Sequence, residues 1–208
     1  MPVRGRPRAF DRAEALQAAM RVFWEHGYEG ASISALTTAM GINAPSLYAA
    51  FHCKEALFRE AVGLYERCHG LAPADGVPVR DAVAGLLRAA AVAYTEPDQP
   101  RGCLVILAAT SYTPKTESVR DHLGARRAAA ATRVRERVSR AAETGELPDG
   151  IDLEVLTDYV ITTIQGMSLR ARDGVSRSAL LAVADAAMAG WDSLTSREAE
   201  RSGVTAER

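Results

Sequence analysis

A small set of hydroxyl and cationic side chains near the start of the chain is suited to contacts with nucleic acid. Ser46 and Tyr48 offer two hydroxyl groups within three residues of one another. Hydroxyl groups bind phosphate oxygens and base edges of DNA. Further upstream, the stretch 4–8 carries three arginines, which suit the narrow and negatively charged minor groove. These residues together predict contact with double-stranded DNA.

Two short helices joined by a tight turn must position these side chains. Ile33, Leu36 and Met40 recur at helical spacing and predict one buried face. Gly41 can adopt the positive φ that ends such a helix. Asn43 is a suitable N-cap for a second helix. This layout is that of a helix-turn-helix, whose second helix enters the DNA major groove.

The second helix has an inward and an outward face. Pro45 follows the cap, and its fixed φ suits a first helical turn. Leu47 and Phe51 lie four residues apart and should face inward. Ser46 and Tyr48 are then left to face a partner. Because this helix has few long donors, direct base readout is expected to be sparse, with close apolar contact to thymine methyls.

Residues 10–60 resemble the N-terminal DNA-binding domain of the TetR family of bacterial repressors. The resemblance rests on Phe23, Gly27, Tyr28, the helix 32–40, Gly41, Ile42, Ser46, Leu47, Tyr48, Phe51 and the stretch 54–57. It implies base contacts from the first turn of the second helix, phosphate contacts from Tyr48 and Lys54, and a place beside the groove for Ser34. The expected DNA-binding residues are Arg4, Arg6, Arg8, Ser34, Ala44, Pro45, Ser46, Tyr48 and Lys54. Cys53 departs from the expected pattern, because cysteine is a poor N-cap for the helix that begins at Lys54.

Helical periodicity runs through the rest of the chain, so we expect an all-α protein. The predicted helices are 11–27, 32–40, 44–51, 54–70, 79–95, 103–109, 117–144, 152–172 and 176–195. Residues 1–53 should form a three-helix DNA-binding domain with a basic arm. Residues 54–208 should form a helical domain for ligand binding and dimerisation.

The second domain is expected to hold a small-molecule site, because helix bundles place such sites between helices. The inward candidates are Tyr94, Leu104, Leu107, Tyr112, Gln165, Met167 and Arg170. For the apolar members, ordinary core packing is the competing interpretation. Gln165 and Arg170 are more informative if buried, because buried polar groups need partners. The family resemblance implies release from DNA by such a ligand; the sequence leaves the ligand unidentified.

Cys103 is a candidate redox residue. It begins a predicted helix, where the helix dipole can lower the pKa of a thiol, and Arg101 is close by. Some TetR-like proteins have an oxidant-reactive cysteine in a comparable Gly-Cys-Leu sequence, which implies a thiol-based sensor of oxidants or electrophiles as an alternative function. The competing interpretation is a small buried hydrophobic residue.

The last two helices are expected to form a dimer interface. Each has an apolar stripe, made up of Leu156, Val160, Thr163, Ile164 and Met167 in one and of Leu180, Ala184, Ala187, Met188 and Trp191 in the other. Each also has a face of small residues, namely Gly166, Ala182, Ala186 and Gly190. Two helices from each chain would make a four-helix bundle across a two-fold axis. Ordinary core helices of a monomer are the alternative.

Composition excludes several other classes of protein. The chain has 208 residues, a formal net charge of −1 and 48% hydrophobic residues, as expected for a globular protein. Its three cysteines form no metal-ligand pattern, and no nucleophile–base pair or phosphate-binding loop stands out. We therefore expect no enzyme activity, no metal and no cofactor. With no apolar run long enough to span a bilayer, the protein is expected to be cytoplasmic. An architectural DNA-binding protein without an effector remains a further alternative.

Overall fold

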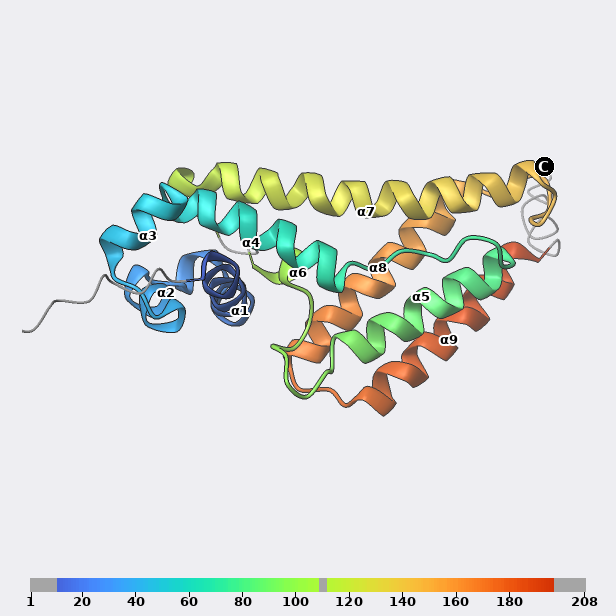
Figure 1. The fold of residues 1–208 in the computed structure, drawn as a ribbon. Helices are drawn as coiled ribbons and strands as arrows, with labels where there is room; N and C mark the ends of the chain where they lie inside the picture. Colours follow the sequence, from blue (N-terminus) through green and yellow to red (C-terminus); the bar gives the residue numbers. More distant parts are fainter. Residues whose placement is uncertain (1–10, 109–111, 197–208) are drawn as a thin grey trace, which may run out of the picture.

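The computed structural model describes residues 11–108 and 112–196, and all regular structure in this part of the chain is helical (Figure 1). The expected positions of Arg4, Arg6 and Arg8 lie outside the described residues. The helices are α1 (Arg12–Gly30), α2 (Ile33–Met40), α3 (Ala44–Phe51), α4 (Lys54–His69), α5 (Val79–Ala93), α6 (Leu104–Leu107), α7 (Glu117–Glu143), α8 (Leu153–Arg172) and α9 (Arg177–Thr195), with a 3₁₀ turn at Pro114–Thr116. The all-α prediction is confirmed.

Side chains cap the beginnings of the first two helices. The Asp11 carboxylate accepts hydrogen bonds from the backbone N–H groups of Ala13 and Glu14, at 2.7 and 3.2 Å. The Ser32 hydroxyl accepts from the Ala35 N–H at 3.0 Å. At the other end of α2, Gly41 has a φ of 65° in the left-handed region. These local contacts satisfy backbone groups that the helix itself leaves unpaired.

The helical backbone of α1 is interrupted at Gly27, where the sequence predicts that the helix ends. Gly27 has a φ of 69° and a ψ of 179°, and a further helical segment, which was not predicted, extends α1 to Gly30. The kink frees the Tyr28 N–H, which donates to the carbonyl of Ala108 at 2.9 Å. A Cβ on Gly27 would lie 3.2 Å from the same carbonyl oxygen. Glycine therefore lets α1 approach the segment after α6 closely.

The buried residues form two apolar cores joined along α7. The first core takes residues from α1 to α4, from α6 and from the beginning of α7. The second takes residues from α5, α7, α8 and α9. The long α7 spans both parts of the molecule (Figure 1). In the first core, the ring of Phe58 on α4 packs edge-on to Phe23 on α1, with centroids 5.0 Å apart. Helix α4 is therefore packed with the first three helices.

Most of the apolar stripes expected at a dimer interface lie inside the protomer. Leu156, Val160, Met167 and Trp191 are buried in the second core with the rest of the α9 stripe. These side chains pack against other helices of the same chain, although Thr163, Met167 and Leu180 also border a groove on the outside of α8 and α9. Within the predicted small face, Gly190 also packs inward, because a Cβ there would meet the Tyr159 hydroxyl. Only the rest of that face, with Gly166, Ala182 and Ala186, is exposed.

Candidate DNA interface and ligand cavity

Helix α3 presents its outer face to solvent at one end of the molecule. The Asn43 side chain caps it by accepting from the Ser46 N–H at 2.8 Å. Leu47 and Phe51 are fully buried, so they fix the orientation of the helix. Tyr48 is 46% exposed, which leaves its hydroxyl free to approach a partner. The inward and outward faces predicted from helical spacing are confirmed.

The first turn of α3 and the start of α2 expose the remaining candidates for base contact. Pro45 is exposed, and Ala44 and Ser46 are half-buried. Ser34, in the first turn of α2, is also exposed. These small side chains leave the backbone of the helix accessible to a closely approaching surface. The major groove of DNA is wide enough to admit such a helix and presents base edges that hydrogen-bond to it.

Lys54, the first residue of α4, sits over an aromatic ring. Its ammonium nitrogen lies 4.4 Å from the centroid of the Tyr28 ring, a cation–π contact that orients the side chain. Burial lowers the pKa of Lys54 below its ordinary value. The Cys53 sulfur accepts weakly from the Ala56 N–H at 3.4 Å, so this poor cap still occupies the N-cap position.

The strained backbone between α3 and α4 could not be predicted from the residue types there. His52 has a φ of 66° and a ψ of −56°, and it is the one non-glycine residue with positive φ in the described part of the chain. The Cys53 N–H donates to the Phe51 carbonyl at 2.8 Å, which closes a γ-turn around His52. This sharp turn sets the angle between α3 and α4.

A cavity of about 100 Å³ lies between α4, α5, α6, α7 and α8. Its lining residues are Tyr65, Glu66, His69, Gly70, Leu71, Leu86, Tyr94, Cys103, Val105, Ile106, Arg126, Arg127, Ala130, Arg133, Val134, Ile161, Ile164 and Gln165. The predicted ligand residues Tyr94 and Gln165 are among them. The arginines of α7 and the aromatic residues of α4 were not predicted, because helical spacing alone does not show which neighbours a side chain meets.

The other five predicted ligand residues do not line this cavity. Leu104 is fully buried in the first core, and Leu107 is half-buried on the same short helix. Met167 is buried in the second core, and Arg170 is exposed, with Asp173 3.6 Å away. All four lie on helices that border the cavity, but the helical twist turns their side chains to other faces.

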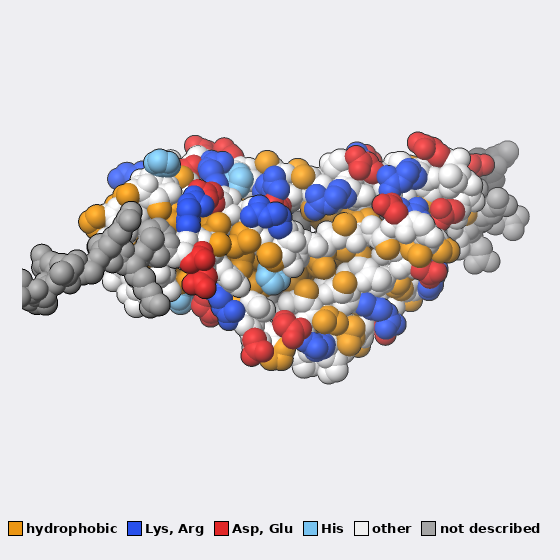
Figure 2. Space-filling view, in the orientation of Figure 1, with side chains coloured by type: hydrophobic (Ala, Val, Ile, Leu, Met, Phe, Trp, Pro, Cys, Tyr) orange, Lys and Arg blue, Asp and Glu red, His pale blue; other side chains and the backbone are white. Residues whose placement is uncertain are grey.

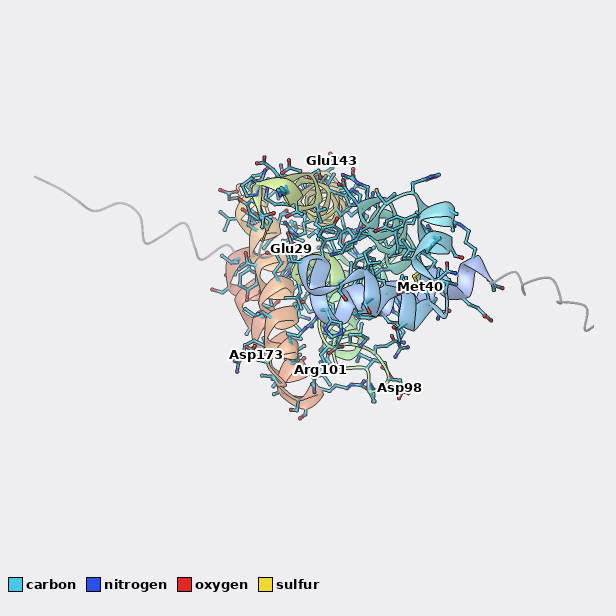
Figure 3. All side chains as sticks on the ribbon, turned by 90° about the vertical axis from the view of Figure 1, so that its left-hand side faces the viewer. Glu29, Met40, Asp98, Arg101, Glu143 and Asp173 are labelled. Carbon is cyan, nitrogen blue, oxygen red and sulfur yellow. The ribbon has the colours of Figure 1, made fainter. Side chains whose placement is uncertain are left out.

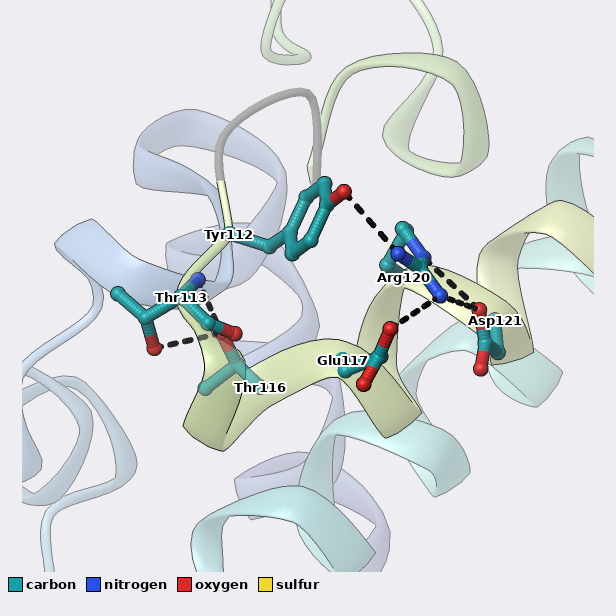
Figure 4. A network of polar contacts seen from close by, with 6 residues as sticks. All are labelled: Tyr112, Thr113, Thr116, Glu117, Arg120 and Asp121. Carbon is teal, nitrogen blue, oxygen red and sulfur yellow. Dashed lines mark hydrogen bonds and ion pairs between the residues drawn. The ribbon is translucent and has the colours of Figure 1, made fainter.

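Tyr112, the fifth of these residues, is held on the surface by a polar network at the start of α7 (Figure 4). Its hydroxyl accepts from Arg120 Nη1 at 3.0 Å, and the guanidinium carbon lies 4.7 Å from the ring centroid. The same guanidinium contacts Glu117 and Asp121 at 2.8 and 2.6 Å. These contacts keep the half-exposed Tyr112 away from the cavity.

Cys103 lines the cavity, but its thiol is not activated. Burial raises the pKa of the Cys103 thiol, and this effect outweighs the hydrogen bonds from Tyr65, Tyr94 and nearby backbone groups. The expectation of a thiol pKa lowered by a helix start is therefore wrong. Helix α6 has only four residues, so its dipole is weak, and the apolar surroundings disfavour the thiolate.

Direct hydrogen bonds connect the cavity to α1. The indole N–H of Trp24 donates to the carbonyl of Gly102, the residue before Cys103, at 2.9 Å. On the same side, the guanidinium of Arg172 at the end of α8 donates to the carbonyls of Trp24 and Glu25, at 2.6 and 2.7 Å. A change in the cavity that moves the start of α6 or the end of α8 must therefore act on α1.

The loop before α6 is also fastened to the end of α8. Arg101 donates to the carbonyl of Val175 at 2.6 Å. Figure 3 labels Asp98 and Arg101 in this loop and Asp173 in the turn after α8. On the other side, Arg21 of α1 donates to the carbonyl of Asp98 at 2.6 Å. The loop thus lies between α1 and α8 and contacts both.

The outer face of α8 and α9 carries a shallow groove and several exposed apolar side chains. Val155, Gly166 and Val183 line the groove, whose volume is about 840 Å³, and Leu169 and Leu194 are exposed on the same two helices. Apolar surface of this kind on adjacent helices is typical of a site for protein association. The outward face of these helices, which the predicted stripes border at Thr163, Met167 and Leu180, is the candidate interface.

Two other classes of site are absent from residues 11–108 and 112–196. No helix there combines the length and the apolar character that crossing a bilayer requires. The same residues contain no cluster of three or more histidine, cysteine or acidic side chains placed to hold a metal ion.

The fold and its exposed α3 define a helix-turn-helix regulator, and comparison with known proteins places it in a family. Residues 15–61 match the model of bacterial regulatory proteins of the tetR family, and residues 79–187 match the tetracyclin repressor-like C-terminal domain. The chain therefore belongs to the TetR family. This finding confirms the resemblance seen in the sequence and extends it to the second domain.

Two curated relatives from Escherichia coli strain K12 align over almost the whole chain. The HTH-type transcriptional repressor ComR is 35% identical over 92% of this chain and 93% of its own length. The HTH-type transcriptional repressor BdcR is 32% identical over 90% of this chain and 91% of its own length. Both similarities include the second domain as well as the helix-turn-helix.

A solved structure with 49% sequence identity shows the same fold. It is a cysteine mutant of the TetR family transcriptional regulator CifR, complexed with 26-base-pair double-strand operator DNA. The similarity covers 89% of this chain and 100% of that chain, with a TM-score of 0.84. A second CifR cysteine mutant with operator DNA gives a TM-score of 0.86 at the same identity.

Proposed function

We propose that this regulator is a cytoplasmic repressor that binds operator DNA as a homodimer and leaves it when a small molecule enters the cavity. The observation that carries the proposal is the direct hydrogen bond from Trp24 of the helix-turn-helix domain to Gly102, the residue before the cavity-lining Cys103. The operator DNA bound by the similar CifR protein supports DNA as the partner. Residues 1–53 would bind DNA, and residues 54–208 would bind the effector and the second protomer. The protein would have no enzymatic activity.

The DNA contacts would divide into two kinds. The first turn of α3, with Ala44, Pro45 and Ser46, would meet base edges in the major groove, with Ser34 beside it. Tyr48 and Lys54 would bind phosphates on either side, and the basic arm with Arg4, Arg6 and Arg8 would follow the minor groove. The exposed face of α3 and the position of Lys54 at the next helix start support this arrangement.

Release would begin at the cavity wall formed by α6. Val105 and Ile106 line the cavity, while Leu104 of the same helix packs in the core of the DNA-binding end. Because α6 is only four residues long, a ligand that displaces Val105 also displaces Leu104. The hydrogen bonds to Trp24 and Tyr28 would then move α1 and change the spacing of the two recognition helices in a dimer.

Replacement of the proposed phosphate-binding residues should weaken binding to every DNA sequence. Lys54→Ala and Tyr48→Ala each remove a group that binds phosphate and reads no base, so site preference should stay the same. Lys54→Ala should also reduce the slope of log affinity against log salt by about one for each phosphate that the protein no longer neutralises. Fluorescence anisotropy on DNA that the protein itself enriches from a random library measures both effects.

Two matched variants separate these contacts from general effects. Arg140→Ala removes the same charge from the far end of α7 and should leave the salt slope unchanged. Ser46→Ala should alter the sequences that are enriched, because it changes a base-facing side chain. If the wild-type protein shows no salt-sensitive binding to any DNA, the proposed function is wrong.

A thiol-based sensor is the second candidate function, and the place of Cys103 in the cavity wall favours it. An oxidant or electrophile would act on the sulfur directly and change the same wall. Because burial raises the pKa of the thiol, little thiolate forms at neutral pH, and the reaction should speed up as the pH rises.

Hydrogen peroxide should then release DNA from the wild type and not from Cys103→Ser. Cys53→Ser is the necessary control, because Cys53 is exposed and precedes Lys54. Equal release of the wild type and Cys103→Ser, or of neither, would exclude a sensor at Cys103. Resistance of Cys53→Ser alone would place the effect at the DNA-binding surface.

A further inference from the structure

The charged side chains that line the cavity carry a net positive charge. Glu66 is the one acidic residue among the lining residues, and it forms a two-point ion pair with Arg126. This pair satisfies both side chains with each other and leaves no carboxylate for the other arginines of the lining. The charge that remains around the cavity is therefore positive.

Two guanidinium groups supply that positive charge. Arg127 is half-buried and donates one N–H to the carbonyl of Val105 at 2.9 Å, which leaves the other donors of its planar fork available. Arg133 lies almost two turns further along α7, and no described residue forms a hydrogen bond or an ion pair with it. Basic side chains gather along α7 above apolar surface in Figure 2. Two such forks around one cavity are suited to an anion with planar oxygen atoms.

Most of the remaining cavity wall is apolar. It includes Leu71, Leu86 of α5, Val134 of α7, and Ile161 and Ile164 of α8. Its other polar side chains are His69, Gln165 and the two tyrosines Tyr65 and Tyr94, which lie beside Cys103. The body of a ligand would therefore meet mainly hydrocarbon, and its charged end would meet Arg127 and Arg133.

The size of the cavity limits the body of the ligand. An apolar cavity of about 150 Å³ is large enough for benzene. The present cavity of about 100 Å³ would have to expand moderately to admit one ring or a short branched chain. Such expansion would push on Val105 and Ile106 of α6, which is the wall that contacts the DNA-binding end.

We propose that the effector is a small hydrophobic monocarboxylic acid, bound as the carboxylate by Arg127 and Arg133 with its hydrocarbon part between α5, α7 and α8. This inference rests on the proposed function for its regulatory consequence, but not for the binding itself. The carboxylate would also compete for the Arg127 fork that holds the Val105 carbonyl. Binding would thus loosen α6 from α7 at the same time as it fills the cavity.

The test compares acids with neutral molecules of the same shape. Benzoate, phenylacetate and hexanoate are titrated into the full-length protein by calorimetry, beside benzamide, phenylacetamide and hexanamide. At least one acid should bind about ten times more tightly than its own amide, since only the acid can form charge-assisted hydrogen bonds with the arginines. The same acid should release the enriched DNA.

Substitutions then locate the anion site. Arg133→Gln should weaken acid binding about tenfold and leave amide binding unchanged, and Arg127→Gln should do the same. Arg135→Gln is the matched control, because Arg135 lies on the same helix, is exposed and pairs with Glu154 outside the cavity lining. Circular dichroism verifies that all three variants fold.

Each other outcome overturns the inference. Equal binding of acids and amides would remove the role of the carboxylate, and equal losses in Arg133→Gln and Arg135→Gln would remove the site. Absence of binding by all three acids would exclude this class of effector. DNA binding without added acid is measured in the same samples, so a protein that binds DNA but no acid contradicts this inference and leaves the proposed function standing.

Discussion

Replacing Gly102 with alanine should lower the free energy of unfolding by roughly 2–4 kcal/mol, through backbone strain and overpacking together. Gly102 has a φ of 80°, where an L side chain is strained. Its added Cβ would lie 2.7 Å from the carbonyl oxygen of Ser168 and 2.6 Å from Leu107 Cδ1. Leu107 can adjust its side chain, but the Ser168 oxygen belongs to the backbone of α8 and cannot move without the helix.

The same substitution should weaken the response to an effector as well as the fold. Gly102 donates its N–H to the carbonyl of Tyr94 at 3.0 Å and accepts from Trp24, so it connects the cavity with α1. Displacing Gly102 would therefore disturb its hydrogen bonds with both Tyr94 and Trp24. Urea denaturation gives the stability change, and anisotropy of labelled DNA gives the change in release.

Gly85→Ala is the matched control for this prediction. Gly85 lies on the exposed face of α5, and a Cβ there would meet nothing within 4 Å. Alanine should stabilise that helix by about 0.5–1 kcal/mol, because it reduces the freedom of the unfolded chain. If Gly102→Ala proved as stable as Gly85→Ala, the close approach of the α6 segment to α8 would be wrong.

The helix-turn-helix could be predicted almost residue by residue, because its signals are local. Gly41 ends α2 in the left-handed conformation, and Asn43 caps α3, as their residue types require. Leu47 and Phe51 face inward because the helical repeat leaves them no other side. Each of these outcomes depends on neighbours within four residues along the chain.

The cavity could be predicted only in part, because its lining comes from five helices that are distant in sequence. Helical spacing shows that Gln165 and Met167 point in different directions, but not which of them meets α7. Arg127 and Arg133 look like ordinary surface charges in the sequence, and only packing reveals that they border a cavity. The raised pKa of Cys103 has the same origin, since burial is a property of the packed helices.

Helices α8 and α9 show the limit of amphipathic patterns most clearly. The strongest apolar stripes are predicted to lie between protomers, yet most of their side chains fill the core of one protomer. Small and apolar residues on two faces of a helix indicate that both faces pack against other helices. The pattern does not show which face packs within the protomer and which packs against a second protomer. Ala187 illustrates this point: it is only 8% exposed, and its carbonyl accepts from the Tyr159 hydroxyl at 2.7 Å.

Placing a charge on the outer face of α9 should therefore disrupt the proposed dimer. Val183 is 46% exposed in the protomer and lines the groove between α8 and α9. Val183→Glu leaves the protomer core intact but would bury two unpaired carboxylates, one from each chain, at a two-fold interface. Burial of charges without partners costs several kcal/mol, roughly 3–5 for a fully buried one, so the protomers should separate.

Separation of the dimer should be a larger defect than removal of any single DNA-binding side chain. A dimer binds two half-sites at once, and the second contact is made at high effective concentration. A monomer keeps only one recognition helix, so affinity for the enriched DNA should fall by about 100-fold or more. Light scattering gives the mass of the variant, and anisotropy gives its affinity in the same buffer.

Val92→Glu is the matched control for Val183→Glu. Val92 is 39% exposed on α5, away from the outer face of α8 and α9, so the same change of side chain should leave mass and DNA affinity unaltered. Helical content and thermal unfolding of both variants should match the wild-type protomer, because neither position belongs to a buried core. A Val183→Glu protein that stays dimeric with full DNA affinity would show that another surface joins the protomers, and the exposed apolar face of α8 and α9 would then need a different partner.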